Sequence, residues 1–318
     1  MVHAPAHTRP RAETVRSPAA AAAVASAAAA RYCTLVPFSH WLAASSAIAA
    51  ATGHQAARHR SARTTVTVHP GLMSSPAPAP RPRRLKELRP AEVAATLAAD
   101  PRLIVPVGTC EQHGPHLPLG GDTLIVERLA DDLSAEFRVL RAPTVEYGVN
   151  VPTARVFAGN AGVRRKTLHR ALNDLAAAWE SEGVREFILL TAHDGDSHLE
   201  ALETVITTAA RVRAVNVFGL DFRDLLEGQL EPMHGDEVDT SLLLYVAPEF
   251  VQMSLAQDYM MADEAVRRYR RGWLEVPAGS PGSIGRPTLA SAEKGQRIYA
   301  RIRDRVRERI FLAPASRS

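Results

Sequence analysis

Short apolar runs and longer amphipathic segments alternate between residues 102 and 221 of the chain. The run "RLIVPVG" at 102–108 is rich in β-branched residues and ends in Gly, a pattern typical of a buried strand. Similar runs at 137–143, 185–193 and 214–221 predict three further strands.

Amphipathic segments between and after these runs predict helices. Residues 123–136 have helical spacing, and residues 164–183 place four large apolar side chains on one face before a terminal Gly. Residues 292–312 predict a closing helix. A further helix after His193 is expected to carry Leu199, Leu202, Val205, Ile206 and Ala209. Strands that alternate with helices predict an α/β domain whose mainly parallel sheet is covered on both faces.

The front of the chain differs in composition from the rest. Residues 1–84 are rich in Ala, Pro and Arg, and such composition buries too little apolar surface to offset the entropy of ordering. We therefore predict a disordered extension and linker over 1–84 and one folded domain over 85–313, with Met73 as an alternative start. An Ala-rich, Arg-bearing front can mimic a transit or signal peptide, but Ala is a weak substitute for the Leu-rich region of a secretory signal.

The positive charge of the chain belongs to its front segment. Residues 1–72 hold seven Arg and one acid, whereas residues 73–318 hold 31 basic and 33 acidic residues. A nucleic-acid partner requires basic residues clustered on a folded face, so we expect none. No stretch is apolar enough to cross a membrane, and two cysteines cannot build a disulfide framework. These features predict a cytoplasmic protein without a membrane partner.

Three segments rich in His, Asp and Glu lie next to the predicted elements. The segment "GTCEQHGPHLPLGGD" (108–122) follows the first strand, "TAHDGDSH" (191–198) follows the third, and "EPMHGDEVDTS" (231–241) precedes a helix. In sheets of this kind the carboxyl ends of the strands form the ligand crevice. We therefore expect the three segments to meet at one edge of the sheet.

The first segment offers candidate metal ligands in Glu111, His113 and Asp122. The Gly and Pro residues around them supply turns that can bring the three side chains together. One Glu, one His and one Asp suit a divalent ion such as Zn, Mn or Fe. Each also has a structural interpretation: Asp122 can cap the helix that begins at Thr123, and Glu111 can be a solvated loop acid. His116 in the same segment is expected to be structural.

The stretch "PVGTCEQHGPHLPLGGDT" closely resembles the signature of the creatininase (creatinine amidohydrolase) family, which usually reads PVGSxEQHGPHLPLxTD. Agreement extends over roughly residues 85–312, through "YGVN" (147–150), "VFAGNAGV" (156–163), "HGDEVDTS" (234–241) and "GSIGRPTLASAEKG" (282–295). The resemblance implies a three-layer α/β/α sandwich with a mainly parallel sheet. It also implies hydrolysis of non-peptide C–N bonds at a binuclear metal site, and a homo-oligomer that is commonly a hexamer.

The resemblance also implies roles for five side chains by position. Glu111 resembles the ligand of one metal, His113 resembles the ligand of the other, and Asp122 resembles the carboxylate that bridges both. His193 takes the place of the ligand His in the family's NGHGGN segment. His234 takes the place of a His implicated in proton transfer.

An acid completes the metal site in the family's HAGExETS segment, and two acids of this chain correspond to it. We predict Glu237 as the ligand, with Asp239 as the alternative. Asp194 and Asp196 add charges that the NGHGGN segment lacks. Either can serve as a further ligand or can hydrogen-bond a metal-bound His.

Together these features predict a hydrolase that holds two divalent ions (Zn, Mn or Fe) per chain and cleaves a small amide, formamide or lactam with an activated water. His234 is the candidate acid that protonates the leaving nitrogen. The segment "VNVPTA" (149–154) replaces a Ser-x-Glu-His segment of the family, which argues against creatinine itself as the substrate. Two alternatives are a peptidase that matures a peptide-derived redox cofactor of the mycofactocin type, and a metal-bearing binding protein without catalytic activity.

Overall fold

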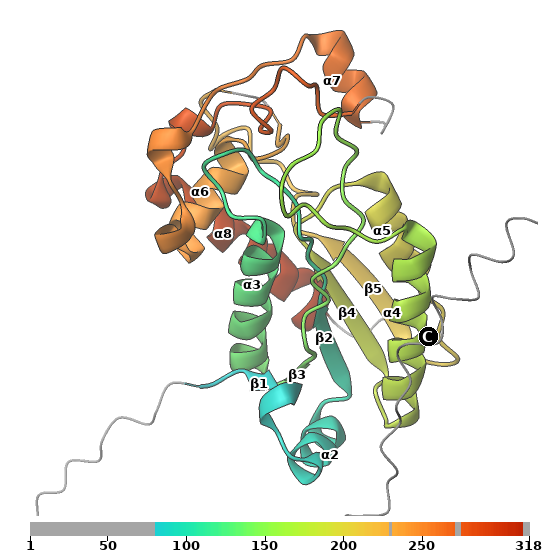
Figure 1. Cartoon of the computed structure of the whole chain (residues 1–318). Helices are drawn as coiled ribbons and strands as arrows, with labels where there is room; N and C mark the ends of the chain where they lie inside the picture. Colours follow the sequence, from blue (N-terminus) through green and yellow to red (C-terminus); the bar gives the residue numbers. More distant parts are fainter. Residues whose placement is uncertain (1–79, 229–230, 271–274, 314–318) are drawn as a thin grey trace, which may run out of the picture. The chain divides into compact units, whose positions relative to one another are not determined.

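The computed structural model describes residues 80–228, 231–270 and 275–313, which all belong to the compact unit Ser75–Ser318. Most of the predicted extension, including the alternative start at Met73, lies outside the described residues. The strands of the described part form one sheet in the order β1-β3-β2-β4-β5, and every neighbouring pair is parallel (Figure 1). The prediction of a parallel sheet is confirmed. The strands are β1 (Arg83–Arg84), β2 (Arg102–Pro106), β3 (Leu140–Arg141), β4 (Glu186–Thr191) and β5 (Arg211–Asn216).

Helices follow most strands, as the alternating pattern predicts. The helices are α2 (Pro90–Ala99), α3 (Gly121–Phe137), α4 (Arg165–Ser181), α5 (Asp196–Glu203), α6 (Glu237–Val246), α7 (Asp263–Arg270) and α8 (Ala292–Val306). A π-helical turn at Arg307–Phe311 extends α8, and short 3-10 turns lie at Leu85–Glu87, Pro248–Phe250, Met253–Leu255 and Pro287–Leu289. Within the described ranges, every helix is too short or too polar to cross a lipid bilayer.

Alternate residues of the central strands face opposite sides of the sheet. Leu103 and Val105 of β2 pack into the core under α4 and α5, whereas Ile104 packs into the core under α3, α6 and α8. The residues of β4 alternate in the same way. Helices therefore cover both faces of the sheet (Figure 1), and the predicted three-layer α/β/α sandwich is confirmed.

The sheet begins two residues before the domain boundary that we expected at residue 85. Arg83 donates its backbone N–H to Ser134 Oγ at 2.8 Å, and Arg84 Nε donates to Asp131 Oδ1 at 2.9 Å. These contacts tie β1 to α3 and place it beside β3. Composition could not reveal this strand because its side chains are held by hydrogen bonds rather than by apolar burial.

The strand β5 begins three residues earlier than its apolar run suggested. Arg211 and Arg213 interrupt the hydrophobic pattern there, although both residues pair in register with β4. Arg213 forms an ion pair with Glu186 of the neighbouring strand, which accounts for a basic side chain at this position.

The helix α5 ends earlier than the periodicity predicted, at Glu203. The backbone N–H of Ile206 instead donates to Asn173 Oδ1 of α4 at 2.9 Å, and the Ile206 side chain is 68% exposed. Val205 and Ile206 therefore belong to the connection to β5.

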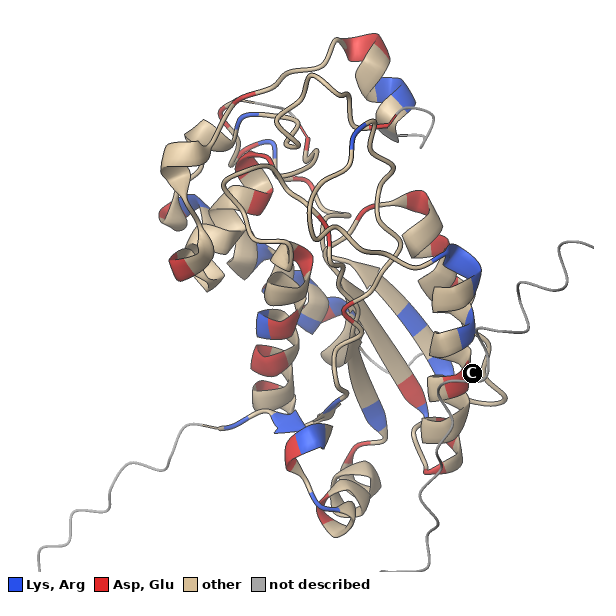
Figure 2. Cartoon of the chain, viewed as in Figure 1, with Lys and Arg blue, Asp and Glu red and all other residues tan. Residues whose placement is uncertain are grey.

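Charged residues are mixed over the surface of the described unit. In the view of Figure 2, Lys and Arg are interspersed with Asp and Glu along the helices. Many of these charges form local ion pairs, such as those between Arg128 and Asp132 and between Arg165 and Glu200.

Gly295 of α8 lies directly against the backbone of α6. A Cβ atom at this position would lie 1.8 Å from Ser241 O and 2.5 Å from Ser241 C, which are backbone atoms that cannot rotate away. Replacing Gly295 by Ala is therefore expected to lower the free energy of unfolding by about 1–3 kcal/mol through overpacking. The loss should appear although Ala favours a helix by about 1 kcal/mol over Gly.

Urea denaturation of the G295A variant measures this loss. Gly279→Ala is the matched control, because a Cβ at Gly279 meets no atom within 4 Å. Equal stability of the two variants would contradict the close approach of α6 and α8.

The connections after β2 and β4 leave the sheet in opposite directions. These strands are neighbours, and α3 after β2 packs on one face of the sheet whereas α5 after β4 packs on the other. Loops that diverge in this way open a crevice outside the carboxyl ends of the two strands. The segments 108–122 and 191–198 lie at that point.

Candidate metal centre

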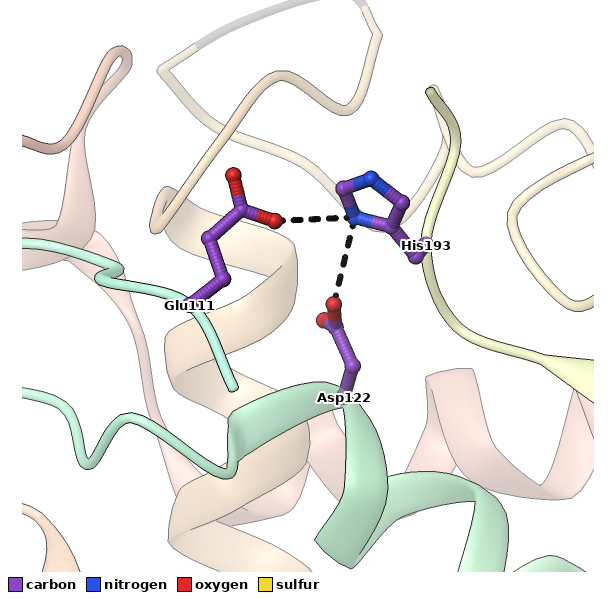
Figure 3. A group of neighbouring side chains, drawn as sticks. All are labelled: Glu111, Asp122 and His193. Carbon is purple, nitrogen blue, oxygen red and sulfur yellow. Dashed lines mark ion pairs between the residues drawn. The ribbon is translucent and has the colours of Figure 1, made fainter. Parts of the chain in front are cut away.

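Three buried side chains from the two diverging connections converge at the crevice. Glu111 lies on the loop after β2, Asp122 lies in the first turn of α3, and His193 lies directly after β4 (Figure 3). One ligand atom from each side chain lies within 4.8 Å of the others. The expectation that the polar segments after β2 and β4 meet at one edge of the sheet is therefore met.

Two glycines allow the polar segments to come together. A Cβ at Gly108 would lie 2.7 Å from Thr123 Cα, so only Gly lets the end of β2 pass the start of α3. Gly235 has a φ of 57°, and a Cβ there would lie 2.3 Å from His113 O. The third polar segment thus lies directly against the backbone of the first.

The carboxylate of Asp122 faces two histidines with its two oxygens. Oδ1 lies 3.1 Å from His113 Nε2, and Oδ2 lies 3.2 Å from His193 Nδ1. Oδ2 also accepts a hydrogen bond of 2.6 Å from Thr109 Oγ1. Glu111 Oε2 lies 3.2 Å from the same Nδ1 of His193. Asp122 therefore stands between two groups of potential ligands.

Backbone groups fix the orientation of these side chains. His113 Nδ1 donates to the carbonyl of Glu111 at 3.0 Å, which leaves Nε2 to face Asp122. Glu111 Oε1 accepts the N–H of Val151 at 2.7 Å, which leaves Oε2 to face His193. Hydrogen bonds of this kind hold metal-binding side chains in one tautomer and one direction.

Burial and mutual attraction shift the pKa values of the four groups. Burial by itself lowers the pKa of a histidine, but the Asp122 carboxylate outweighs it and raises the pKa of His113 to about 10. For His193, burial is outweighed by Glu111 and Asp122, and the pKa rises to about 9. Burial raises the pKa of Glu111. Burial opposes ionisation of Asp122 as well, but His113 and His193 together hold its pKa well below the usual range.

Two atoms of the group are buried without a hydrogen-bond partner. These atoms are Glu111 Oε2 and His193 Nε2. A buried polar atom that lacks a partner costs about 1–3 kcal/mol, and such sites call for an ion or a bound molecule. Carboxylate oxygens and imidazole nitrogens are ligands for Zn, Mn or Fe. The donor set and the orphaned Oε2 of Glu111, which faces His193 Nδ1, therefore fit a divalent cation.

The structure does not bring Glu237, our predicted ligand, to this group. Both of its oxygens face away from the site: Oε1 pairs with Lys294 Nζ and accepts the N–H of Glu227, and Oε2 accepts the N–H of Gly228 at 3.0 Å. Asp239, the alternative acid, lines the same cavity as His113 and interacts with it electrostatically. Asp239 therefore replaces Glu237 in our account of the site.

Helix geometry explains why only one of the two acids can face the site. Asp236 caps α6 by accepting the N–H groups of Val238 and Asp239. Residues two apart on a helix point about 200° away from each other. Because Glu237 faces Lys294 of α8, Asp239 faces the crevice.

A cavity of about 660 Å³ opens from these side chains. Near the cluster its wall is formed by His113, Asp122, His193, His234, Asp239 and Tyr269. Asp194 and Asp196, the two added charges of the loop after β4, also line it, and both residues are exposed. Tyr269 was not anticipated from the sequence, since nothing in the surrounding "DEAVRRYR" indicates a site.

His234 lies beside His113 at the cavity wall. The two rings stack with their centroids 4.5 Å apart, and His234 Nε2 lies 2.7 Å from the carbonyl of Gln112. Burial and the neighbouring His113 lower the pKa of His234 to about 3, so the ring is neutral. The neutral ring of His234 therefore donates from Nε2 to the carbonyl of Gln112.

Two further histidines of the polar segments have structural partners. His116 Nε2 contacts Thr240 Oγ1 at 2.8 Å, in agreement with its expected structural role. His198 Nδ1 accepts the N–H of Val149, which leaves Nε2 to donate to Thr191 Oγ1 at 3.0 Å. Thr191, which replaces the family's Asn, thereby joins the end of β4 to the loop at residue 149.

Comparison with known proteins identifies relatives of the whole described unit. Residues 86–310 match the family model Creatininase, described as creatinine amidohydrolase. The chain is 30% identical over 221 residues to the mycofactocin precursor peptide peptidase of Mycobacterium ulcerans, covering 64% of this chain and 82% of that protein. It is 26% identical to the 3-dehydro-scyllo-inosose hydrolase of Thermotoga maritima (61% and 71% covered) and 26% identical to the creatinine amidohydrolase of Pseudomonas putida (64% and 86% covered).

Solved structures show the same fold. A crystal structure of creatinine amidohydrolase aligns with a TM-score of 0.61 at 22% identity, covering 71% of this chain and 97% of that chain. A manganese form of creatininase aligns with a TM-score of 0.59, and a mutant creatininase of the Zn-Zn type aligns with 0.60, each at 23% identity and covering 71% of this chain and 98% of the other. Proteins with this fold have thus been solved in forms named for manganese and for zinc.

Proposed function

Because the chain belongs to the creatininase family, we propose that it is a hydrolase that uses two divalent metal ions to cleave the C–N bond of a small amide, formamide or lactam. The observation that carries the proposal is the placement of Asp122 between His113 and His193, with one carboxylate oxygen toward each. A carboxylate in this position can bridge two cations.

Each ion would have its own ligands in addition to Asp122. Glu111 and His193 would hold the first ion, since their facing atoms lie within 4.8 Å of one another and of Asp122. His113 and Asp239 would hold the second ion, since both line the cavity beside Asp122. When bound, two divalent ions lower the pKa of a water between them and polarise the substrate carbonyl.

The side chains around the ions supply the proton transfer. An amide nitrogen leaves poorly as an anion, so it must be protonated before the C–N bond breaks. We propose that His234 carries the proton from the attacking water to the leaving nitrogen, as its position in the family segment implies. Its stacking on His113 places the ring beside the second set of ligands.

Metal content and hydrolysis test this proposal together. We expect purified protein to contain close to two divalent ions per chain, measured by inductively coupled plasma mass spectrometry. Removal of the ions with a chelator should abolish hydrolysis of a panel of formamides, lactams and primary amides, and added Zn²⁺ or Mn²⁺ should restore it. Full activity of a metal-free preparation would refute the proposal.

Metal removal should also make stability depend on pH. The folded-state pKa values of about 10 for His113 and about 9 for His193 lie above the value of about 6.5 expected in the unfolded chain. Groups with raised pKa values stabilise the fold fully below about pH 6.5 and lose this contribution as the pH rises through their folded values. We therefore expect the free energy of unfolding of the chelated protein to decrease between about pH 6.5 and pH 10.

Urea denaturation across this range measures the decrease. The metal-loaded protein is the control. Its free energy of unfolding should decrease less over this range, because metal binding requires the neutral imidazoles that high pH favours. An increase in the stability of the chelated protein over the same range would contradict the charge arrangement described here.

A second candidate function is a peptidase of the mycofactocin precursor type. The size of the cavity favours it, because about 660 Å³ exceeds the space that a small amide needs. The similarity to the peptide peptidase of Mycobacterium ulcerans is the second reason. Hydrolysis of short peptides with rejection of every small amide in the panel would select this candidate over the first.

We also propose that the protein acts in the cytoplasm as a homo-oligomer, as its resemblance to the family implies. Two exposed aromatic side chains that line the same hollow support self-association: Tyr147 at 57% exposure and Phe250 at 51%. Analytical ultracentrifugation tests this, and a monomer at micromolar concentration would contradict it.

A further inference from the structure

One polar group at the metal centre has no role in the proposed reaction so far. Tyr269 comes from α7, a helix separated by about 70 residues of sequence from the loop after β4, yet it lines the same cavity as Asp122 and His193. In Figure 1, α7 lies on the side of the sheet where the loops that follow β2 and β4 gather. The chain therefore brings a phenol to the metal centre from a separate element.

Tyr269 lines the cavity and is itself only partly exposed. It is near enough to interact electrostatically with Glu111, Asp239, Asp236 and Asp194. Burial, reinforced by these carboxylates, raises the pKa of Tyr269 far above its usual value. The phenol thus keeps its proton and remains a hydrogen-bond donor.

Several side-chain N–H donors along the cavity already have acceptors within the chain. Asn150 Nδ2 donates to the backbone carbonyl of residue 110 at 2.9 Å. Arg223 is paired with Asp221, and His198 donates to Thr191. Among the described residues that line the cavity, two carry a hydroxyl group: Ser197, which is exposed, and Tyr269, which is partly buried.

We propose that Tyr269 is a catalytic residue whose O–H donates a hydrogen bond to the substrate carbonyl oxygen as negative charge develops on it. The inference rests on the proposed hydrolytic function, because only attack on a carbonyl creates this charge. Donors fixed in advance toward a developing oxyanion, in a site shielded from water, stabilise the transition state more than the ground state. Removal of one such donor typically lowers kcat by about 10²–10³-fold.

Binding of a small tetrahedral anion tests the role without knowledge of the substrate. Methylphosphonate imitates the tetrahedral, negatively charged centre that forms on a carbonyl under attack. The full chain is loaded with Co²⁺, and methylphosphonate is titrated against its visible absorption. We expect Tyr269→Phe to retain the Co²⁺ content of the wild type and to bind methylphosphonate about 10-fold more weakly or worse, since one hydrogen bond to a charged group is lost.

Tyr147→Phe is the matched control, because Tyr147 also carries a phenol but lies outside this cavity. It should bind both Co²⁺ and methylphosphonate as the wild type does. Where a hydrolysed amide is found, Y269F should lower kcat with little change in KM, whereas loss of a binding contact would raise KM.

The outcomes separate this inference from the proposed function. Normal Co²⁺ content with equal methylphosphonate affinity in wild type and Y269F would overturn the role of Tyr269 and leave the metal centre standing. Loss of Co²⁺ from Y269F would also overturn it, since the phenol would then support the ligands rather than the substrate. Failure of the wild type to bind Co²⁺ would overturn the proposed function and this inference together.

Discussion

Replacement of Asp122 by Asn is expected to remove both metal ions and with them all hydrolytic activity. Asp122 directs one oxygen toward His113 and the other toward His193, so its negative charge serves both halves of the proposed centre. Loss of a mere hydrogen-bond partner of a metal ligand typically costs about 10–100-fold in metal affinity. Loss of a ligand that both ions share should lower the affinity for each ion by more than this factor. Metal analysis after gel filtration measures the result.

Glu111→Gln is the informative comparison for Asp122→Asn. Glu111 approaches His193 and lies in the first proposed set of ligands alone, so this variant should lose one ion and keep the other. The hydroxyl of Thr109 donates a hydrogen bond to Asp122. A variant of Thr109 should therefore weaken the binding of both ions, but less than D122N does. Retention of two ions by D122N would eliminate the bridging role.

The second large effect is expected in the interface between α6 and α8. Lys294 is 2% exposed and pairs with Glu237, which is fully buried. Replacing Lys294 by Met removes the positive charge and leaves the carboxylate of Glu237 buried without a counter-ion. Breaking a buried ion pair in this way costs about 3–5 kcal/mol. Urea denaturation should show a loss of this size in the free energy of unfolding.

A double variant separates the charge effect from lost packing. Lys294→Met combined with Glu237→Gln leaves no buried charge, and the Gln carbonyl can still accept an N–H from the loop at Glu227. The double variant should therefore recover much of the stability that K294M loses. Glu237→Gln alone should keep its metal ions, because Glu237 lies outside the candidate ligands. If K294M were as stable as the wild type, the ion pair would be irrelevant to folding.

The sequence predicted the elements whose burial follows a simple period. The run at 102–108 became β2 because its side chains are buried on both faces of the sheet, and a continuous apolar run is what such burial requires. Elements held by charge were harder to predict. Arg83, Arg84 and Arg213 lie in strands because of partners on other elements, and single-sequence patterns contain no information about those partners.

The residues of the candidate site also fall into those that the sequence could predict and those that it could not. The convergence of Glu111, Asp122 and His193 could be expected because the carboxyl ends of parallel strands meet at one edge of a sheet, and the resemblance to the creatininase family assigned their individual roles. The choice between Glu237 and Asp239 could not, because it depends on which face of α6 meets Lys294, more than fifty residues later in the chain. Tyr269 was missed for a related reason. Its helix, α7, is placed beside the site by long connecting loops. The path of such loops cannot be predicted from local sequence patterns.

The first turn of α6 contacts α8 on one face and lines the candidate site on the other. Glu237 anchors the helix to α8, and Asp239, two residues later, faces the crevice. A shift of α8 along this ten-residue helix would therefore be transmitted to the cation site within a single turn. We therefore expect substitutions in α8, far from the cavity, to change the affinity for the ions without altering any ligand.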